Sequence, residues 1–253
     1  MKIAVCVKAV PDASGGRRLD PGTKRLDRSG EPALSDYDTH PVEEALKLKE
    51  AAGDGEVVVV SMGPTRALDA LRKALAMGAD RAVLVSDEAL EGADLLVTAK
   101  AIAGALERES ADLVLFGQQS ADADGACLWA AVAERLRQPT ISQVSELTVE
   151  SGSVTGKRQT EFGYDTIRAP LPAVVAVADS INTPRYPSLK GIMGAKKKPQ
   201  ETLSAADVGG AAESRTSVLA LGAPPARGDA RRIEDDGSAA EQIVAFLAEK
   251  RLI

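Results

Sequence analysis

Residues 56–87 read EVVVVSMGPTRALDALRKALAMGADRAVLVSD, and this stretch decides the fold class. It begins with four consecutive valines, which are typical of a strand buried on both faces. A helical repeat of leucines follows, at Leu68, Leu71 and Leu75. Gly78 is suited to end that helix, and RAVLVSD then begins a second strand. A strand, a helix and a strand at this spacing predict a βαβ unit with parallel strands.

The same alternation extends to both sides of this unit. Further strands are expected at 2–8, 111–117 and 172–179, and further helices at 39–53, 92–109 and 124–136. These strands are apolar, as parallel strands are when helices cover both faces of their sheet. We therefore predict an α/β fold, a three-layer sandwich with a mostly parallel, Rossmann-like sheet. In the first long helix, we expect Pro41 in the first turn and Gly53 at the end.

Three segments depart from this pattern. Residues 9–35 are rich in Pro, Gly, Asp and Arg, and indicate a long loop or a polar hairpin. Polar and apolar residues alternate on both sides of SGS in 142–163, which predicts a β-hairpin at about 143–165. Residues 200–236 indicate an extended arm, and 237–253 an amphipathic terminal helix. We therefore expect an α/β domain at 1–199 and a C-terminal arm and helix at 200–253, which either wraps a partner or folds back on its own core.

Composition excludes several classes of protein. The chain has 31 basic and 37 acidic residues, and this acidic balance argues against broad nucleic-acid binding. No apolar run approaches the roughly 20 residues that span a bilayer, and the N-terminus reads as a strand rather than a leader, so we expect a cytoplasmic protein without membrane insertion. Cys6 and Cys127 are expected to be reduced thiols. With His40 as the only histidine, neither a metal site nor a Cys–His catalytic pair is expected.

One local cluster runs against the acidic average. Residues 180–200, SINTPRYPSLKGIMGAKKKPQ, contain no acid. Their five cations are Arg185, Lys190, Lys196, Lys197 and Lys198. Prolines and large apolar residues lie among these cations, which indicates either one local partner surface or a solvated face.

Ligands of open α/β sheets bind at the carboxyl ends of the strands. Three such ends are candidates: the loop after Val7, SMGPT at 61–65, and FGQQSADADGACLW at 116–129. In the last of these, Ser120, Asp122 and Asp124 offer helix caps and polar contacts, and free N–H groups at the helix start suit a phosphate. A simple turn with an Asp cap is the alternative. The P-loop, G-x-G-x-x-G and G-x-S-x-G patterns are absent, and no histidine accompanies the two aspartates as a catalytic pair would require.

Five segments in fixed order carry a resemblance to a known family. They are VKAVPD (7–12), VEEALKLKE (42–50), GPTRALDALRKALAMGADRAVLV (63–85), GQQSADADG (117–125) and NTPRYPSLKGIMGAKKKP (182–199). Together they resemble the β subunit of electron transfer flavoproteins. The resemblance implies a fold related to adenine nucleotide α-hydrolases and a heterodimer with an α subunit that holds most of the FAD. It also implies AMP in the β subunit, or a second FAD in electron-bifurcating members.

The same resemblance implies a function without catalysis by this subunit alone. The heterodimer would accept electrons from flavin-dependent dehydrogenases, such as the acyl-CoA dehydrogenases of fatty acid oxidation. It would pass them to a quinone oxidoreductase or another acceptor. A nucleotide-hydrolysing enzyme of the same fold would instead need a Ser-Gly-Gly-x-Asp-Ser loop, whereas the SGG at 14–16 is not followed by Asp-Ser. A nucleotide-sensing stress protein would need neither the basic cluster nor the arm.

Carried over position by position, the resemblance implies nucleotide contacts at four places. The residues are Cys6, Ser35, Asp36, Tyr37, Asp38, Met62, Gly117, Gln118, Gln119, Ser120, Ala121, Asp122, Ala123, Asp124, Gly125, Ala126, Cys127 and Leu128. Ser35 and Asp36 depart from the family pattern. So do residues 125–127, Gly-Ala-Cys, which stand where polar side chains often help to hold phosphate, and Trp129, which stands where Gly is frequent and would crowd a larger FAD.

The resemblance also implies a docking loop at about 183–194, with Leu189 at its tip entering an apolar pocket of a dehydrogenase. The implied partner-binding residues are Arg185, Tyr186, Leu189, Ile192, Met193, Lys196 and Lys197. Pro184 and Pro187 would lower the cost of ordering the loop, and the lysines would steer an acidic partner. Alternatively, Arg185 pairs with a carboxylate of the α subunit or near the flavin, and the lysines form a solvated face.

Overall fold

The computed structural model describes residues 1–12, 16–150, 152–223, 225–226 and 231–253. It forms two compact units, Met1–Val218 and Leu219–Ile253.

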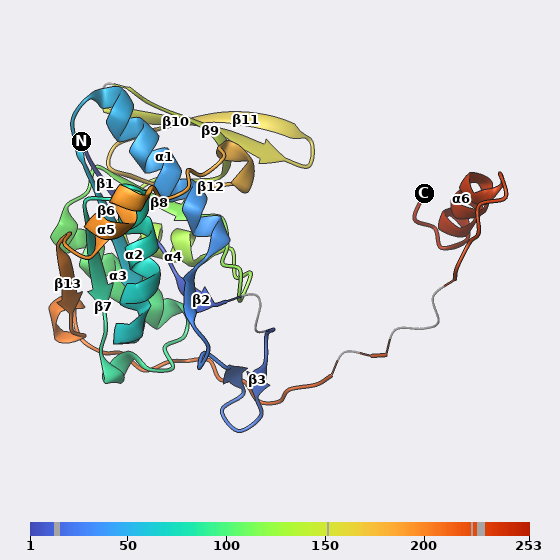
Figure 1. Cartoon of the computed structure of the whole chain (residues 1–253), viewed down its shortest axis with the longest axis horizontal. Helices are drawn as coiled ribbons and strands as arrows, with labels where there is room; N and C mark the ends of the chain where they lie inside the picture. The colour runs from blue at the N-terminus through green and yellow to red at the C-terminus, as the bar shows by residue number, and fades with distance from the viewer. Residues whose placement is uncertain (13–15, 151, 224, 227–230) are drawn as a thin grey trace. The chain divides into compact units, whose positions relative to one another are not determined.

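The first unit is built on a nine-stranded sheet (Figure 1). In spatial order its strands are β11 (Gly163–Pro170), β10 (Ser153–Thr160), β9 (Thr140–Glu150), β12 (Ala173–Val177), β8 (Leu113–Gly117), β1 (Lys2–Cys6), β6 (Glu56–Met62), β7 (Arg81–Val85) and β13 (Gln200–Leu203). In this spatial order, every neighbouring pair from β9 to β13 at the far side of the sheet is parallel. The pairs β11–β10 and β10–β9 are antiparallel. The sheet is therefore mostly parallel, with an antiparallel meander at one edge.

Two short antiparallel ladders form the segment between β1 and the first helix. They join β2 (Ala9–Pro11) to β5 (Pro32–Leu34), and β3 (Leu19–Asp20) to β4 (Arg25–Leu26). The expectation of a polar hairpin in this segment is confirmed for its described residues.

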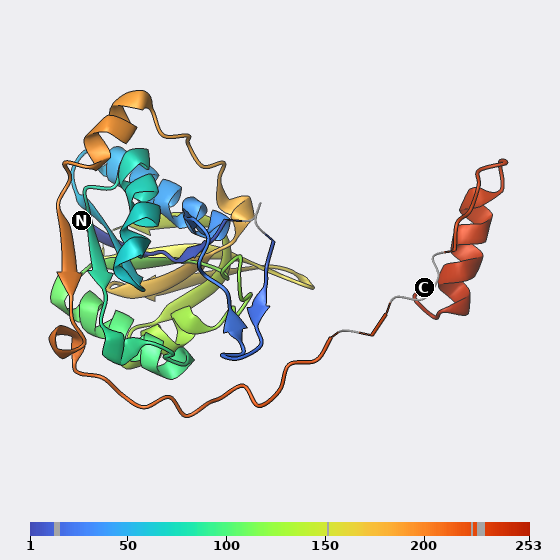
Figure 2. The ribbon, with the colours of Figure 1, turned by 60° about the horizontal axis from the view of Figure 1, so that its bottom comes forward.

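Helices cover both faces of the sheet (Figure 2). The α-helices of the first unit are α1 (Asp36–Ala52), α2 (Leu68–Met77), α3 (Leu95–Glu109), α4 (Leu128–Leu136) and α5 (Leu189–Ala195), and its 3₁₀ turns are η2 (Thr65–Ala67), η3 (Glu88–Leu90), η4 (Asp179–Ile181) and η5 (Ala206–Val208). Side chains of α1, α2 and α5 share one buried cluster, and those of α3, α4 and η5 share the other. Along β1, Ile3 and Val5 join the first cluster, while Ala4 and Cys6 join the second. The predicted three-layer α/β sandwich is confirmed.

Two helices begin at other places than the sequence pattern indicated. Helix α1 begins at Asp36, so Pro41 lies inside the helix rather than in its first turn. Helix α4 begins at Leu128 rather than at 124, because Asp124 and Ala126 have left-handed backbones, with φ of 47° and 37°. The ends predicted at Gly53 and Gly78 are confirmed as the C-cap positions of α1 and α2.

The sheet is also wider than the sequence pattern indicated. The expected hairpin is a three-stranded meander, because β11 adds a further strand after β10. At the other edge, β13 pairs in parallel with β7, and Leu203, Ala205 and Val208 are buried. The compact unit consequently extends beyond residue 199, to Val218.

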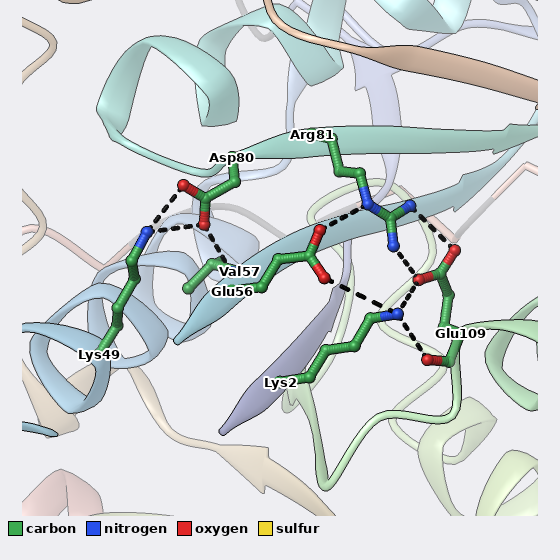
Figure 3. A network of polar contacts seen from close by, with 7 residues as sticks. All are labelled: Lys2, Lys49, Glu56, Val57, Asp80, Arg81 and Glu109. Atoms are coloured by element: carbon green, nitrogen blue, oxygen red, sulfur yellow. Dashed lines mark hydrogen bonds and ion pairs between the residues drawn. The ribbon is translucent and has the colours of Figure 1, made fainter. Parts of the chain in front are cut away.

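An ion-pair network joins the amino ends of three strands (Figure 3). Lys2 Nζ lies 2.7 Å from Glu109 Oε2, and Arg81 Nε lies 2.7 Å from Glu56 Oε1. Arg81 also donates through Nη1 to Glu109 Oε1 at 3.0 Å. Burial opposes the ionisation of Glu109, but the hydrogen bonds from Arg81 and Lys2 outweigh it and lower the pKa of this carboxyl. The network therefore ties α3 to β1, β6 and β7.

The second unit contains α6 (Ala239–Glu249), which agrees with the predicted terminal helix. Its apolar side chains Ile243 and Val244 are exposed, as is Leu252 beyond its end. Packing of this unit on a partner subunit stays a prediction. No helix in the described part of the chain has the length and apolarity to cross a membrane.

Candidate functional site

The candidate site lies along the carboxyl ends of the parallel strands, which together form the carboxyl edge of the sheet. Cys6, Met62 and Gly117 end the neighbouring strands β1, β6 and β8, as their parallel pairing requires. The chain continues from β8 into Gln118, whose N–H donates to Val177 O at 3.0 Å. The parallel register therefore brings the chain segments of the predicted nucleotide site to one edge.

Gly117 allows α1 to approach this edge closely. A Cβ atom at this position would lie 2.8 Å from both Asp38 Oδ1 and Tyr37 O, so any larger residue would displace the start of α1. Asp38 is buried, and its Oδ2 accepts the N–H of Lys8 at 2.7 Å. Burial raises the pKa of Asp38 to about 8, against the opposing effect of Lys8. Burial, and then the proximity of Asp38, raises the pKa of the Cys6 thiol. Both groups are therefore protonated at neutral pH.

The loop after β8 is fixed by hydrogen bonds at several points. Gln118 Oε1 accepts the N–H of Gln143 at 2.9 Å, and Gln118 O accepts the indole N–H of Trp129 at 3.2 Å. The Ala121 N–H donates to Ser35 Oγ at 3.3 Å, which joins the loop to the residue before α1. Trp129 thus stabilises the loop from the first turn of α4.

A charged cluster lies at the centre of this loop. Asp122 is almost fully buried, and its Oδ1 lies 2.8 Å from Lys8 Nζ. Arg28 forms a second ion pair with Asp122 through Oδ2, and Arg17 donates to the carbonyl of Ala121. Burial opposes the ionisation of Asp122, but Lys8 and then Arg28 outweigh it and lower its pKa to about 2. Asp122 is therefore a carboxylate at every physiological pH.

The expected capping role of the loop residues is not observed. The N-cap of α4 is Cys127, which makes no side-chain capping bond. Asp122 binds cations instead, and Asp124 Oδ1 accepts a hydrogen bond from Gln119 Nε2 at 3.3 Å. The backbone N–H of Asp124 donates to Ser120 O at 3.0 Å, which closes a turn before the helix. These contacts stabilise the loop itself and do not cap α4.

The structure brings most of the predicted nucleotide residues to one edge and also brings three cations to the same loop. Ser35 contacts Ala121, Gly117 lies against Tyr37 and Asp38, and Asp38 acts on the nearby Cys6. Met62 ends β6 at the same edge. In the rest of the loop, Ala123, Asp124, Gly125 and Cys127 are exposed, and Ala126 and Leu128 are half-buried. Sequence reasoning missed Lys8, Arg17 and Arg28. The Arg-rich composition of the hairpin after the first strand was the available signal.

The predicted docking segment is held firmly at its beginning. Arg185 Nε lies 2.7 Å from Glu43 Oε2, and its Nη1 lies 2.6 Å from Glu50 Oε1. Asn182 Nδ2 donates to His40 O and to Glu44 Oε2, both at 3.0 Å. Arg185 therefore pairs with carboxylates of α1 in its own chain.

The apolar part of the docking segment differs from the expected loop tip. Leu189 begins α5, and Ser188 caps this helix by accepting the N–H of Gly191 at 3.0 Å. Tyr186, Leu189 and Met193 are exposed by 95%, 81% and 77%. Ile192 is also exposed. A Cβ atom on Gly191 would lie 2.3 Å from Ala76 O, so α5 packs against the end of α2 through bare backbone.

The lysine run divides into two parts. Lys198 donates to Leu75 O at 2.8 Å and to Ala79 O at 2.6 Å, where it satisfies carbonyl groups at the end of α2. Burial lowers the pKa of Lys198. Lys190, Lys196 and Lys197 are exposed. The exposed lysines are close in sequence to the exposed apolar residues, whereas Lys198 has a structural role.

Two further features lie outside these sites. One cavity of about 450 Å³ lies between α3, α4 and η5, and is lined by none of the predicted nucleotide residues. Among the residues that the structure describes, no group of three or more His, Cys, Asp or Glu side chains is arranged to hold a metal ion.

The comparisons with known proteins agree on one family. The family model described as the electron transfer flavoprotein domain matches residues 23–208. The electron transfer flavoprotein subunit beta of Mycobacterium tuberculosis is 40% identical over 263 aligned residues, covering 99% of each chain. That of Thermoanaerobacterium thermosaccharolyticum is 41% identical, covering 82% of this chain and 79% of its own. The caffeyl-CoA reductase–Etf complex subunit CarD of Acetobacterium woodii is 36% identical over the full length of both chains.

Proposed function

The chain belongs to the electron transfer flavoprotein β-subunit family, and we propose that it pairs with an α subunit to carry electrons between flavoenzymes. The α subunit would hold most of the FAD, and this chain would complete the FAD site and bind AMP at the carboxyl edge of its sheet. The electrons would come from flavin-dependent dehydrogenases, such as those of acyl-CoA oxidation, and pass to a quinone oxidoreductase or another acceptor. This subunit would catalyse no reaction alone, and its expected location is the cytoplasm.

The cationic cluster around Asp122 is the observation that carries the nucleotide proposal. Lys8 and Arg28 converge on a loop at the carboxyl edge, where open α/β sheets bind their ligands. A phosphate requires positive charge and N–H donors, and this cluster has both. The residues present therefore fit a nucleotide phosphate.

A second FAD in place of AMP is the alternative for the same edge. The full-length similarity to a subunit of the caffeyl-CoA reductase–Etf complex favours considering it. Trp129 argues for the smaller ligand, because its side chain is held against the loop by the bond to Gln118 O. AMP is therefore our proposed ligand.

The exposed residues of the docking segment support a weak, fast-exchanging contact with dehydrogenases. Burying one leucine such as Leu189 contributes about 1.5–3 kcal/mol, which anchors a partner without trapping it. Arg185 and Ser188 hold the segment in place before binding, so little ordering cost remains. Lys196 and Lys197 would steer an acidic partner surface towards it.

The second unit supports a further contact with the α subunit. The apolar side chains Ile243, Val244 and Leu252 are exposed and need a surface to cover them. We assign that surface to the α subunit. Deletion of residues 219–253 should then weaken subunit association.

The decisive experiment is co-expression with the α subunit of the same genome, followed by acid extraction of the purified complex. One FAD and one AMP per heterodimer would support the proposal. Two FAD molecules would identify the bifurcating alternative, and one FAD alone would remove AMP from the proposal. A colourless monomer that hydrolyses ATP would contradict the proposed function and favour a hydrolase of the same fold.

A further inference from the structure

The hairpin between β1 and α1 reaches over the loop that follows β8, and Figure 2 shows the two segments close together. Arg28 on this hairpin pairs with Asp122, and its Nη1 donates to Ala9 O at 3.3 Å. Arg17 reaches the same loop through the carbonyl of Ala121. Together with Lys8, which lies between β1 and β2, three cations from one segment of the chain meet at this loop.

The loop itself contributes no cation that would hold an anion. Residues 125–127 are Gly, Ala and Cys, and Cys127 makes no side-chain bond at the start of α4. Asp124 is exposed and carries negative charge. A phosphate bound at this edge therefore needs its positive partners from another part of the chain.

The cations have binding capacity left for a second anion. A guanidinium group has five N–H donors in a planar fork. Among the described residues, Arg28 uses two of them, on Asp122 and Ala9, and Arg17 uses one on Ala121. Both arginines are exposed, so a ligand can reach their remaining donors. Among the described side-chain contacts of these three cations, the one carboxylate is that of Asp122.

We propose that Lys8, Arg17 and Arg28 form the phosphate-binding part of the nucleotide site, with the Asp122 carboxylate holding Lys8 and Arg28 in position for the phosphate. The ligand class is an adenine nucleotide, and the cations contact its phosphate rather than its base or ribose. This assignment rests on the proposed nucleotide function. It places the phosphate contacts on the hairpin instead of on residues 125–127.

The test compares AMP with adenosine, which lacks only the phosphate. The nucleotide is removed from the purified heterodimer, and both probes are titrated by calorimetry into the wild type, Arg28→Ala and Arg17→Ala. Arg18→Ala is the matched control, because it removes an exposed cation of the same hairpin. The described backbone bond of Arg18 is to Asp27, within that hairpin. Fluorescence of the single tryptophan, Trp129, checks that each variant keeps the loop folded.

We expect Arg28→Ala and Arg17→Ala each to weaken AMP binding about tenfold or more, since each removes a charge-assisted hydrogen bond. Adenosine affinity should stay unchanged, and Arg18→Ala should bind both probes as the wild type does. Wild-type AMP affinity in both arginine variants would overturn the proposal. An equal loss for AMP and adenosine would also overturn it, because the arginines would then only fasten the hairpin to the loop. A wild-type heterodimer that binds neither probe would contradict the proposed nucleotide function itself.

Discussion

Replacing Asp38 with Asn should remove a pH-dependent destabilisation of the fold. Burial raises the folded-state pKa of Asp38 to about 8, whereas an unfolded aspartate titrates near ~3.9. Between these values the folded chain retains a proton that the unfolded chain has lost, so the free energy of unfolding decreases as the pH rises. The slope is about 1.36 kcal/mol per pH unit, or about 2.7 kcal/mol between pH 5 and pH 7.

The Asp38→Asn variant keeps an oxygen that can accept the Lys8 N–H but has no proton to lose. Its stability relative to the wild type should therefore rise by about 2.7 kcal/mol from pH 5 to pH 7. Urea unfolding followed by the fluorescence of Trp129, the only tryptophan, measures this difference. Parallel stability curves for variant and wild type across this range would refute the raised pKa.

Asp122→Asn is the matched control, because it removes a carboxylate at the same edge whose pKa is shifted in the opposite direction. The pKa of Asp122 is lowered to about 2, below the unfolded value, so its stabilisation is complete above about pH 5 and is lost only as the pH falls towards 2. Removing this carboxylate should destabilise the chain by an amount that stays constant from pH 5 to pH 8.

Three further predictions concern other parts of the chain. Leu189→Ala should leave folding and FAD content intact but weaken dehydrogenase binding roughly 10- to 150-fold, as measured by the concentration dependence of electron transfer, because it removes the exposed apolar side chain that the partner would bury. Gly191→Ala should reduce the same transfer, because its Cβ would lie 2.3 Å from Ala76 O and displace α5. Glu109→Ala should lower the free energy of unfolding by about 3 kcal/mol in urea titrations, since Arg81 and Lys2 lose their buried counter-charge and keep only the more exposed Glu56.

Exposed residues elsewhere provide the controls for these variants. Leu96→Ala removes a half-exposed leucine from α3, on the opposite face of the sheet, and should leave electron transfer unchanged. Wild-type transfer in both Leu189→Ala and Gly191→Ala would contradict the docking proposal. Glu107→Ala removes an exposed carboxylate near the end of the same helix as Glu109. An equally small effect of both glutamate variants would mean that the ion-pair network contributes little.

The central part of the fold was predictable because local and global signals agree there. The valines of β6 and the leucines of α2 have the periods of a buried strand and a packed helix, and they form those elements. The lateral edges of the sheet were not predictable, because local signals do not indicate strands there. Strand β13 has four residues and depends on pairing with β7, and β11 exposes most of its side chains. Neither segment has a period that distinguishes it from a loop.

The candidate site was predictable where it follows from chain direction. Parallel strands end at one edge, so Cys6, Met62 and Gly117 had to come together. The cations were not predictable, because Arg28 and Asp122 lie 94 positions apart and Arg17 and Ala121 lie 104 apart. The late start of α4 depends on two left-handed residues, which helix propensity does not reveal.

The ion-pair network of Lys2, Glu56, Arg81 and Glu109 lies at the amino ends of the strands, opposite the edge where the nucleotide site is proposed. The central strands have five to seven residues, so at about 3.3 Å per residue they put roughly 15–20 Å between the network and the nucleotide edge. Substitutions this far apart without a shared partner add their effects to within about 0.5 kcal/mol. Changes in ligand preference can therefore accumulate at one edge while the opposite edge maintains the stability of the sandwich.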